Sequence, residues 1–525
     1  MTNQPLFHES VPDPSAPLSV RPGPDRPSDW GSLVADLSRR PADTTFRIHD
    51  RTHVEFAVDY RVGPGARTTS YVWEVFFFAP ESLRLHSRTY DKSDLYTDLQ
   101  SYVRFEVPEV EFHALAGEPI NTLADALDVG DDERAMREMR LFACQVRSAG
   151  AELRARIFAA LSAPDDEPRR ALHLAARLAA DAQRITSRLR EVLARADGRS
   201  DSLRTAARWV DEDVSRLLET LLAFVARRLT KHGAPPGLIE TLERAALAEA
   251  SYRVQTGIAG VGTVGMKRRE VEALEFRRHV LKRFTSSVLW LSPQVRPAST
   301  WVLQLLYAIA AGLAMAFAIA AAFWNGFEVG AQGWVTWVLI AVVAYAIKDR
   351  MKAVLQTAFS NVVDRHFPDR RWRIDDRERG VTLGTMKEQS GFTPFAALPP
   401  AVLAARRVTR QHPLEEQARP ETVIYHKKEV DIRPERVAEA DPRFSALTEI
   451  FRLDFSRWLA HTDDPKRDIL FADPIAQTLG SAEAPRVYNI AAVYRLRLAD
   501  DEDAAWHRLR IVVSRKGIRR IEHIS

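Results

Sequence analysis

Two long apolar runs, joined by a short glycine-rich connection, interrupt a chain whose apolar positions otherwise recur every two or every three to four residues. The first run, 301–324, has Gln304 as its only strongly polar side chain, and the second, 330–347, has no charge before Lys348. As a helix, the first run would extend roughly 36 Å, enough to cross a hydrocarbon core of about 30 Å. The pattern therefore predicts a two-helix transmembrane hairpin at 299–348. A buried hairpin inside a soluble domain is the alternative, disfavoured by the length of the first run.

Basic residues flank this hairpin on both sides, whereas the connection at 325–333 has none and carries only Glu328. By the positive-inside rule, both flanks are cytoplasmic and the connection faces outward. The same basic groups are candidates for binding anionic lipid headgroups. They are Lys267, Arg268, Arg269, Arg277, Arg278, Lys282 and Arg283 before the hairpin, and Lys348, Arg350 and Lys352 after it.

Before the hairpin, the spacing of the apolar positions changes from every two residues, as in a strand, to every three to four residues, as in a helix. Residues 1–44 are rich in proline and predict a disordered tail. From 45 to 130, alternation such as Val54, Phe56, Val58 and Tyr60 predicts a small β-rich domain, in which a run apolar on both faces near 68–78 is a central strand. From 131 to 259, four long helices with short polar breaks predict an antiparallel bundle or coiled-coil stalk; their expected ranges are 131–162, 169–196, 202–231 and 237–254.

The segment 260–298 combines a glycine motif with a basic, membrane-proximal helix. Residues 260–265 match the pattern G-x-G-x-x-G. A dinucleotide-binding fingerprint requires a preceding strand, and here the preceding stretch has helical periodicity. The motif therefore favours a hinge, with nucleotide binding as the alternative.

After the hairpin, residues 349–380 predict an amphipathic helix followed by a charged linker, and 381–525 predict a cytoplasmic α+β domain with an antiparallel sheet. A helix is expected at 443–460, and tight turns at 500–503 and 516–517. The complete fold prediction is an α+β membrane protein: a small antiparallel sheet, a bundle of long helices, a transmembrane hairpin and a C-terminal α+β domain.

Composition indicates the location of the protein in the cell, but it says little about the reaction or binding that the protein carries out. The net charge is only +4, so no overall signal for nucleic-acid binding exists, and one cysteine, Cys144, excludes an internal disulfide. Arginine greatly outnumbers lysine and alanine is abundant, which is typical of GC-rich bacterial genomes. These features predict the bacterial inner membrane, with several membrane passes and both termini in the cytoplasm.

No local motif for catalysis, a metal or a cofactor stands out. The histidines are scattered, and single ones such as His426 and His461 are more often structural than catalytic; Asp463 and Asp464 precede a proline and predict a turn. In the first apolar run, small residues recur every four positions and predict close helix packing, within the hairpin or between protein copies. One such row contains Ala308, Gly312, Ala316 and Ala320.

These patterns favour a non-catalytic inner-membrane protein that holds two cytoplasmic domains at the bilayer for assembly, scaffolding or signal relay. Anionic lipid and either a protein partner or a second copy are the expected partners, and no cofactor is expected. An oligomeric channel or transport component is one alternative, although neither run contains the ionisable residue that transport pathways usually have. A membrane-bound enzyme with a site between its cytoplasmic domains is the other.

Overall fold

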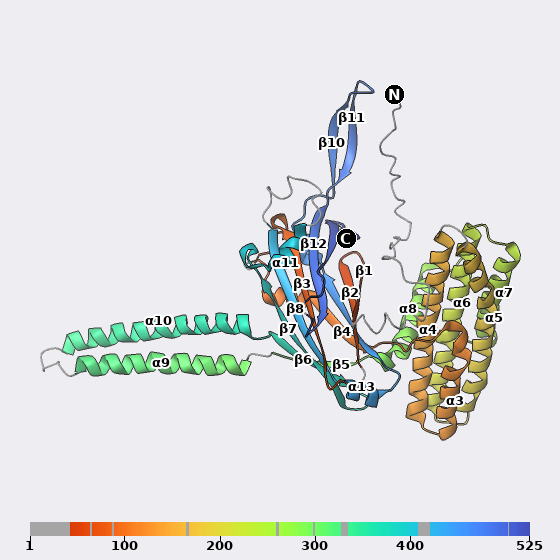
Figure 1. Ribbon diagram of the computed structural model, residues 1–525, viewed down its shortest axis with the longest axis horizontal. Helices are drawn as coiled ribbons and strands as arrows, with labels where there is room; N and C mark the ends of the chain where they lie inside the picture. Colours follow the sequence, from red (N-terminus) through yellow and green to blue (C-terminus); the bar gives the residue numbers. More distant parts are fainter. Residues whose placement is uncertain are drawn as a thin grey trace. The chain divides into compact units, whose positions relative to one another are not determined.

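The computed structural model describes residues 42–524, apart from 64–65, 87–88, 164–166, 259–261, 298–299, 327–333, 408–420 and 502. The fold is mixed helix and sheet, and every described pair of neighbouring strands is antiparallel (Figure 1). This confirms the α+β class. The predicted tail lies outside the described residues except for its last three, which belong to the first strand.

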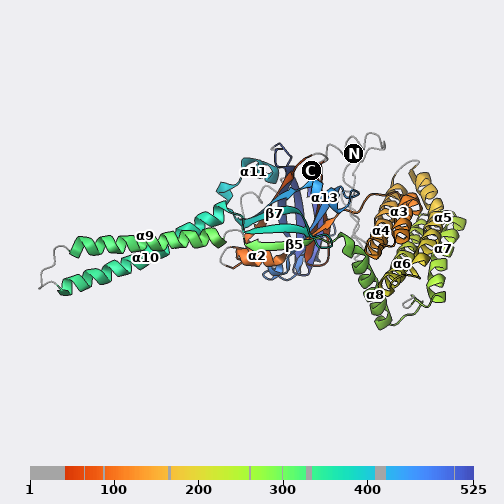
Figure 2. The same ribbon diagram turned by 90° about the horizontal axis from the view of Figure 1, so that it is seen from below.

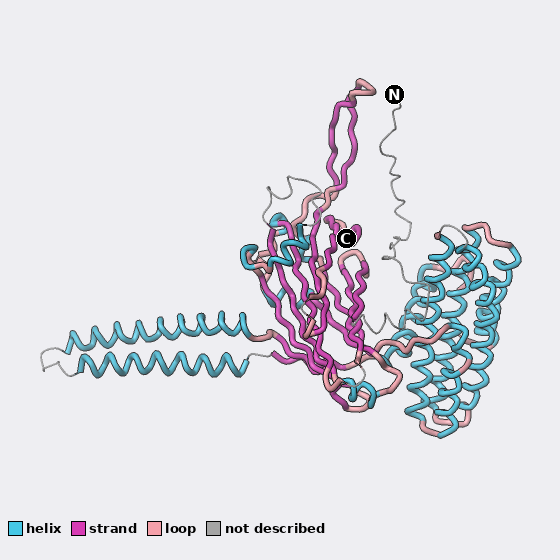
Figure 3. Tube along the Cα trace, in the orientation of Figure 1, coloured by secondary structure: helices cyan, strands magenta, loops and turns pink. Residues whose placement is uncertain are grey.

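Two large sheets form the β part, and Figure 3 draws their strands in magenta. The smaller sheet has the order β1-β2-β9-β4, with the bounds Ala42–Ile48, His53–Arg61, Ala446–Asp454 and Leu99–Phe105. The larger has the order β14-β13-β12-β3-β8-β7-β6-β5, with the bounds Gly517–Ile524, His507–Ser514, Tyr488–Leu498, Thr69–Pro80, Glu421–Ile432, Val381–Phe392, Arg370–Asp376 and Ser292–Pro297. Buried side chains of both sheets share one hydrophobic core, so the two sheets form a sandwich.

The central strand predicted near 68–78 is confirmed. Strand β3 pairs with β8 on one side and β12 on the other. Its inward side chains, including Trp73 and Phe77, join the core between the sheets. Its outward Phe76 and Phe78 are also buried, in a smaller cluster with Leu398 and Val402, where helix α11 (Pro400–Arg407) lies. Both faces of β3 are therefore covered, as its uninterrupted apolar run indicates.

The prediction of separate β-containing domains at 45–130 and 381–525 was wrong. Strands β2 and β4 both pair with β9, and β3 pairs with β8 and β12, so each sheet contains strands from both segments. Alternation along one strand fixes which side chains face the core but carries no information about which distant strand pairs with it. The two segments consequently form one sandwich.

The helix predicted at 443–460 was also wrong, because this segment is strand β9 followed by the single turn α14 (Ser456–Leu459). The core-facing positions of β9 are Leu447, Glu449, Phe451 and Leu453. A buried glutamate in the second of these positions interrupts the apolar alternation that would have indicated a strand. The turn at Gly517 is confirmed: its φ is +119°, a conformation that favours glycine.

The predicted helical bundle is confirmed, with ends within a few residues of those expected. The four predicted helices are α4 (Asp132–Ser162), α5 (Glu167–Leu193), α6 (Asp201–Lys231) and α7 (Pro236–Gln255). A fifth helix of the bundle, α3 (Glu118–Val129), lies in the segment that was predicted to be β-rich. The side chain of Asp131 accepts a hydrogen bond from the backbone N–H of Arg134 (3.0 Å) and so caps α4. Along α6, Val214, Leu218 and Val225 are buried, but Phe224 is exposed.

The hairpin consists of α9 (Thr300–Gly326) and α10 (Trp334–His366), which run side by side in both views (Figures 1 and 2). Among the described helices, only α9 is long and apolar enough to cross a membrane, over Trp301–Ala321. The second predicted span does not meet this criterion, because the described part of α10 has only the residues 334–347 before its first charge. The charged linker expected after it is in part strand β6.

Candidate functional site

The most unusual surface in the described chain is the apolar exterior of the α9–α10 hairpin. Large apolar side chains are exposed around α9 rather than along one stripe: Trp301, Leu305, Ile309, Leu313, Met315, Phe317, Ile319, Phe323 and Trp324. Helix α10 adds Val338, Leu339, Val342, Val343, Tyr345 and Ile347. Contiguous apolar surface of this extent is rare on soluble proteins and is typical of membrane or protein contact sites.

The contact between the two helices uses one row of small residues and leaves the other row outside. Ala310 and Ala314 are almost completely buried. The predicted packing residues Ala308, Gly312, Ala316 and Ala320 are all exposed. Small residues allow close backbone approach, so the inner row explains the tight packing of α9 on α10. The outer row remains available for a contact outside the hairpin.

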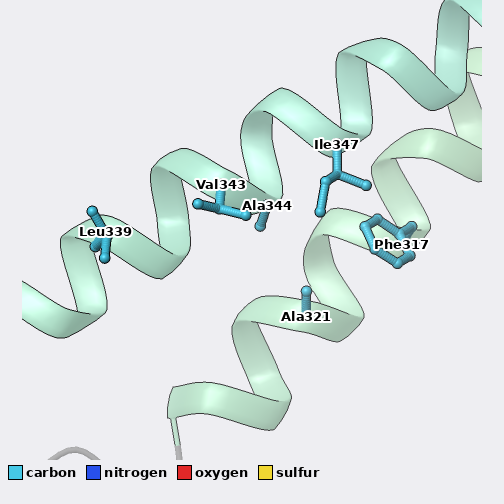
Figure 4. Close-up of a pocket in the computed structure, with 6 residues that line it drawn as sticks. All are labelled: Phe317, Ala321, Leu339, Val343, Ala344 and Ile347. Atoms are coloured by element: carbon cyan, nitrogen blue, oxygen red, sulfur yellow. The ribbon is translucent and has the colours of Figure 1, made fainter.

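The residues that line a shallow apolar groove of about 240 Å³ show which parts of the two helices lie next to each other (Figure 4). Phe317 and Ala321 of α9 line it together with Leu339, Val343, Ala344 and Ile347 of α10. Because the helices are antiparallel, the residues after Ile347, which begin with Lys348, Asp349 and Arg350, lie beside residues of α9 that precede Phe317. The charge-free parts of the two helices are therefore offset along the hairpin.

The hairpin is inserted between two paired strands of the large sheet. Strand β5 ends at Pro297, just before α9, and β6 begins at Arg370, just after α10; these two residues are partners in the antiparallel β5–β6 pair. Both ends of the hairpin therefore emerge from one edge of the sheet.

The basic residues of α8 (Arg268–Ser286) divide into two groups. Arg277 donates two hydrogen bonds of 2.6 Å to the buried Glu212 of α6, which raises the pKa of Arg277, and Arg278 donates to Thr220 (2.6 Å). These two side chains are therefore used in packing α8 on the bundle. Arg278 is nevertheless exposed. The other exposed basic side chains are Lys267, Arg268, Arg269, Lys282 and Arg283 on α8 or at its start, and Arg350 and Lys352 on α10; of these, Arg268 forms an ion pair with Glu272 (3.0 Å).

Two predicted features remain, namely Lys348 and the glycine motif at 260–265. The Lys348 ammonium lies 3.8 Å from the centre of the Tyr345 ring and 3.7 Å from Asp349. Gly262 and Gly265 follow helix α7 and precede α8, while Gly260 lies outside the described residues. A helix in place of the required strand removes the structural context of a dinucleotide fingerprint.

A buried ionic cluster, which the sequence did not reveal, lies between the two sheets. The Lys428 ammonium on β8 is 2.8 Å from Glu388 on the neighbouring β7 and forms a second ion pair with Glu449 on β9 of the opposite sheet. Tyr60 donates a hydrogen bond of 2.8 Å to Glu449, and Ser101 donates another. All three charged side chains are at most 4% exposed.

The two carboxylates determine the charge state of Lys428. Burial alone lowers the pKa of an ammonium, but the attraction of Glu388 and Glu449 outweighs it and raises the pKa of Lys428 above its ordinary value. Lys428 is consequently protonated at neutral pH. A protonated amine has no free electron pair, so this cluster is suited to holding the two sheets together rather than to nucleophilic chemistry.

His426 lies next to this cluster and is sealed from solvent. Its Nδ1 is 2.5 Å from the Ser390 hydroxyl, and its ring stacks on Phe451 with 5.3 Å between ring centres. Its Nε2 has no hydrogen-bond partner among the described residues. Burial, and then the charge of Lys428, lowers the pKa of His426 well below its ordinary value. The imidazole is therefore neutral in the folded protein.

We expect this neutral histidine to make the protein less stable in acid. In the unfolded chain His426 takes up a proton near about pH 6.5, whereas in the folded protein it stays neutral. The stability that the buried neutral histidine contributes is therefore fully present above about pH 6.5 and is lost as the pH falls below that value. The loss approaches about 1.4 kcal/mol per pH unit for one proton. Denaturant unfolding of the detergent-solubilised protein at several pH values should show a shallower acid slope for His426→Gln. The exposed His113→Gln is the control and should keep the parent slope.

Backbone and side-chain contacts connect the end of the hairpin to this cluster. Asp369, between α10 and β6, donates its backbone N–H to the carbonyl of Glu388 (2.7 Å). Its carboxylate accepts hydrogen bonds from the Ser390 N–H (2.9 Å) and from the Tyr96 hydroxyl (2.8 Å). The same carboxylate forms an ion pair with Lys92 (2.6 Å). Asp369 therefore ties the base of the hairpin to the two residues of β7 that enter the buried cluster.

One sequence signal for this cluster existed. In β7 and β8, polar residues occupy inward positions in strands that otherwise alternate, namely Glu388 and Ser390 beside His426 and Lys428. Among the described residues, no group of three or more histidine, cysteine, aspartate or glutamate side chains is arranged to hold a metal ion. In comparisons with protein-family models, curated proteins and solved structures, the chain has no match.

Proposed function

We propose that this chain is a non-catalytic protein of the bacterial inner membrane whose α9–α10 hairpin anchors the sandwich and the helical bundle at the cytoplasmic face. The apolar exterior of the hairpin carries this proposal. In water its exposed side chains would cost about 25 cal/mol for each Å² of apolar surface, whereas a hydrocarbon layer removes that cost. The orientation is supported by the connection at 325–333, which has no basic residue, and by the basic residues that flank the two helices at their other ends.

The offset between the two helices determines how both could cross the bilayer. Helix α9 has 21 consecutive residues suited to the membrane, but α10 meets its first charges at Lys348, Asp349 and Arg350. Long basic side chains can extend toward the headgroups while their stems remain in apolar surroundings. A two-span arrangement then has these residues at the cytoplasmic boundary, with local thinning of the bilayer beside α10, whose apolar stretch is the shorter one.

Scaffolding or signal relay is the role that the base of the hairpin favours. The helices continue directly into the paired strands β5 and β6, and Asp369 joins their end to β7. Packed elements of this kind can transmit a displacement, provided that they have two discrete arrangements. The exposed row from Ala308 to Ala320 offers a surface for the hairpin of a second copy. Lipid and a second copy or protein partner are the proposed contacts.

The two groups of basic residues on α8 give a direct test of lipid contact. In a variant without the hairpin, Arg268→Gln with Arg269→Gln should weaken binding to anionic vesicles by roughly fivefold per residue at low salt, since each exposed basic group near the surface contributes about 1 kcal/mol. Arg277→Gln with Arg278→Gln removes the same charge from side chains that are hydrogen-bonded to Glu212 and Thr220 of the bundle, and should weaken vesicle binding less. Equal losses in both variants, or equal binding to neutral vesicles, would contradict the proposal.

The positions of the chain ends relative to the membrane test the anchor itself. A hairpin with both ends in the cytoplasm leaves only the connection around Gly330 outside. Location of the termini on opposite sides would require an odd number of crossings and would contradict this arrangement.

A further inference from the structure

Strands β10 (Lys466–Asp473) and β11 (Thr478–Pro485) form a two-stranded arm that belongs to neither large sheet. Figure 3 shows the arm as two magenta strands with no other strand beside them. Almost every residue in it is exposed, and the exposed fraction reaches 81% at Leu470, 94% at Ile475 and 88% at Leu479. An isolated hairpin of this kind has marginal stability in water, and its free edges can accept a further strand.

The two edges of the arm are not equivalent. Strand β11 contains Gly480, over which the Phe471 ring lies, and ends in Pro485, which lacks a backbone donor. Glycine and proline both weaken a strand as a pairing partner. Strand β10 has neither residue and carries the central sequence Ile469-Leu470-Phe471. The edge of β10 is therefore the better site for an added strand.

We propose that β10 pairs in antiparallel fashion with β10 of a second copy of this chain, centred on Leu470, to form a four-stranded sheet. In such a pair, the two-fold axis is perpendicular to the sheet, and opposite residues point to the same face. Leu470 lies opposite Leu470 of the second copy, and Ile469 opposite its Phe471. Arg467 lies opposite its Asp473, which creates two ion pairs across the interface.

Charge complementarity selects this occupant and this register. Within its own arm, Arg467 is paired with the uncharged Ala484, and it has no ion pair among the described residues. By contrast, Lys466 already pairs with Glu483. If the pairing is centred on Ile469, Arg467 lies opposite Phe471; if it is centred on Phe471, Asp473 lies opposite Ile469. Of these three registers, which centre the pair on the apolar residues of β10, only the one centred on Leu470 places opposite charges together.

Asp473 remains available for this second ion pair. Its carboxylate accepts hydrogen bonds from the backbone N–H groups of Ile475 (2.8 Å) and Ala476 (3.0 Å), which close the turn of the arm. These bonds lower the pKa of Asp473, so the carboxylate is ionised at neutral pH. A carboxylate has about four acceptor positions, so Arg467 of a second copy can bind without opening the turn.

Disulfide cross-linking of the full chain in native membranes tests the proposal. Opposite Cα atoms in an antiparallel pair are about 4.5–5.5 Å apart, within the range for a disulfide. Leu470→Cys should therefore form a covalent dimer under mild oxidation. Leu479→Cys is the matched control on β11: it is slightly more exposed but has no partner in the proposed register. The parent, whose Cys144 is buried, should give no dimer.

A charge reversal separates the specific register from accidental collision. Combined with Leu470→Cys, Arg467→Asp places like charges opposite each other twice and should reduce the dimer yield several-fold. Asp468→Arg changes the charge by the same amount at a position opposite Ala472, and should have little effect. The proposal is overturned if Leu470→Cys gives no dimer, which is the result expected if β10 pairs with a different partner. It is also overturned if Leu479→Cys cross-links equally well, or if Arg467→Asp leaves the yield unchanged.

Discussion

Excision of the α9–α10 hairpin is expected to move the protein from the membrane fraction to the soluble fraction while the sandwich stays folded. Strands β5 and β6 are antiparallel neighbours, with Pro297 opposite Arg370. A short Asn-Gly loop can therefore replace residues 298–368, with Asp369 retained because it contacts β7. Fractionation of cells followed by circular dichroism of the soluble protein measures both parts of this expectation.

The matched control keeps the hairpin but changes its connection to the sheet. Lengthening the chain between Pro297 and Thr300 by a few glycine and serine residues should leave the protein in the membrane, because the apolar exterior is intact. If the excised variant remains in the membrane at high salt, a surface other than the hairpin holds the protein there. If it is soluble but unfolded, the hairpin has a structural role in the sandwich that the strand pairing does not indicate.

Replacement of Lys428 by methionine is expected to lower the free energy of unfolding by about 3–5 kcal/mol, which is the usual cost of removing one partner from a buried ion pair. The effect is large because Lys428 is the cation shared by Glu388 and Glu449. Without it, two carboxylates face each other between the sheets. Denaturant unfolding of the solubilised protein, followed by the fluorescence of its tryptophans, provides the measurement.

Neutralising both partners should restore most of the lost stability. In the triple variant Lys428→Met, Glu388→Gln, Glu449→Gln, no buried charge remains, and a glutamine at 449 can accept a hydrogen bond from one of the hydroxyls of Tyr60 and Ser101 and donate one to the other. Replacement of a complete buried ion network by neutral groups is often close to neutral in energy. If the single variant loses less than about 1 kcal/mol, or the triple variant is no more stable than the single one, the cluster does not hold the sheets together.

The helices of the bundle could be predicted because their signals are local. Apolar positions three and four residues apart, the capping residue Asp131, and the break at Gly233 and Pro235 indicated the ends of α4 to α7 within a few residues. The central strand β3 was equally clear, since both of its faces are apolar. These features depend on neighbouring residues, which a single sequence contains.

The assembly of the sandwich could not be predicted in the same way. Pairing of β9 with β2 and β4 joins residues more than 300 positions apart, and alternation alone does not specify partners. The buried cluster made this harder, because Glu449 and Lys428 place charges at inward positions where a strand pattern requires apolar residues. Their mutual compensation is visible only after the two sheets face each other.

For the candidate site, sequence identified the hairpin and its basic flanks but not which basic groups are free. Arg277 and Arg268 are equivalent in a count of charges. Arg277 nevertheless binds the buried Glu212, whereas Arg268 is exposed beside Glu272. The same applies to the small residues of α9: spacing identified two rows, and only packing distinguished the inner Ala310 and Ala314 from the outer row.

The location of the hairpin connection tests the membrane anchor most directly. A reporter enzyme that is active only outside the cytoplasm, inserted near Gly330, should be active, and the same reporter fused at Asn3 or after Ser525 should be silent. Matched fusions to a reporter active only inside the cell should give the reverse pattern. An inactive reporter at Gly330 together with a silent reporter at both termini would mean that the hairpin does not cross the bilayer, and activity at either terminus would contradict the arrangement with both ends in the cytoplasm.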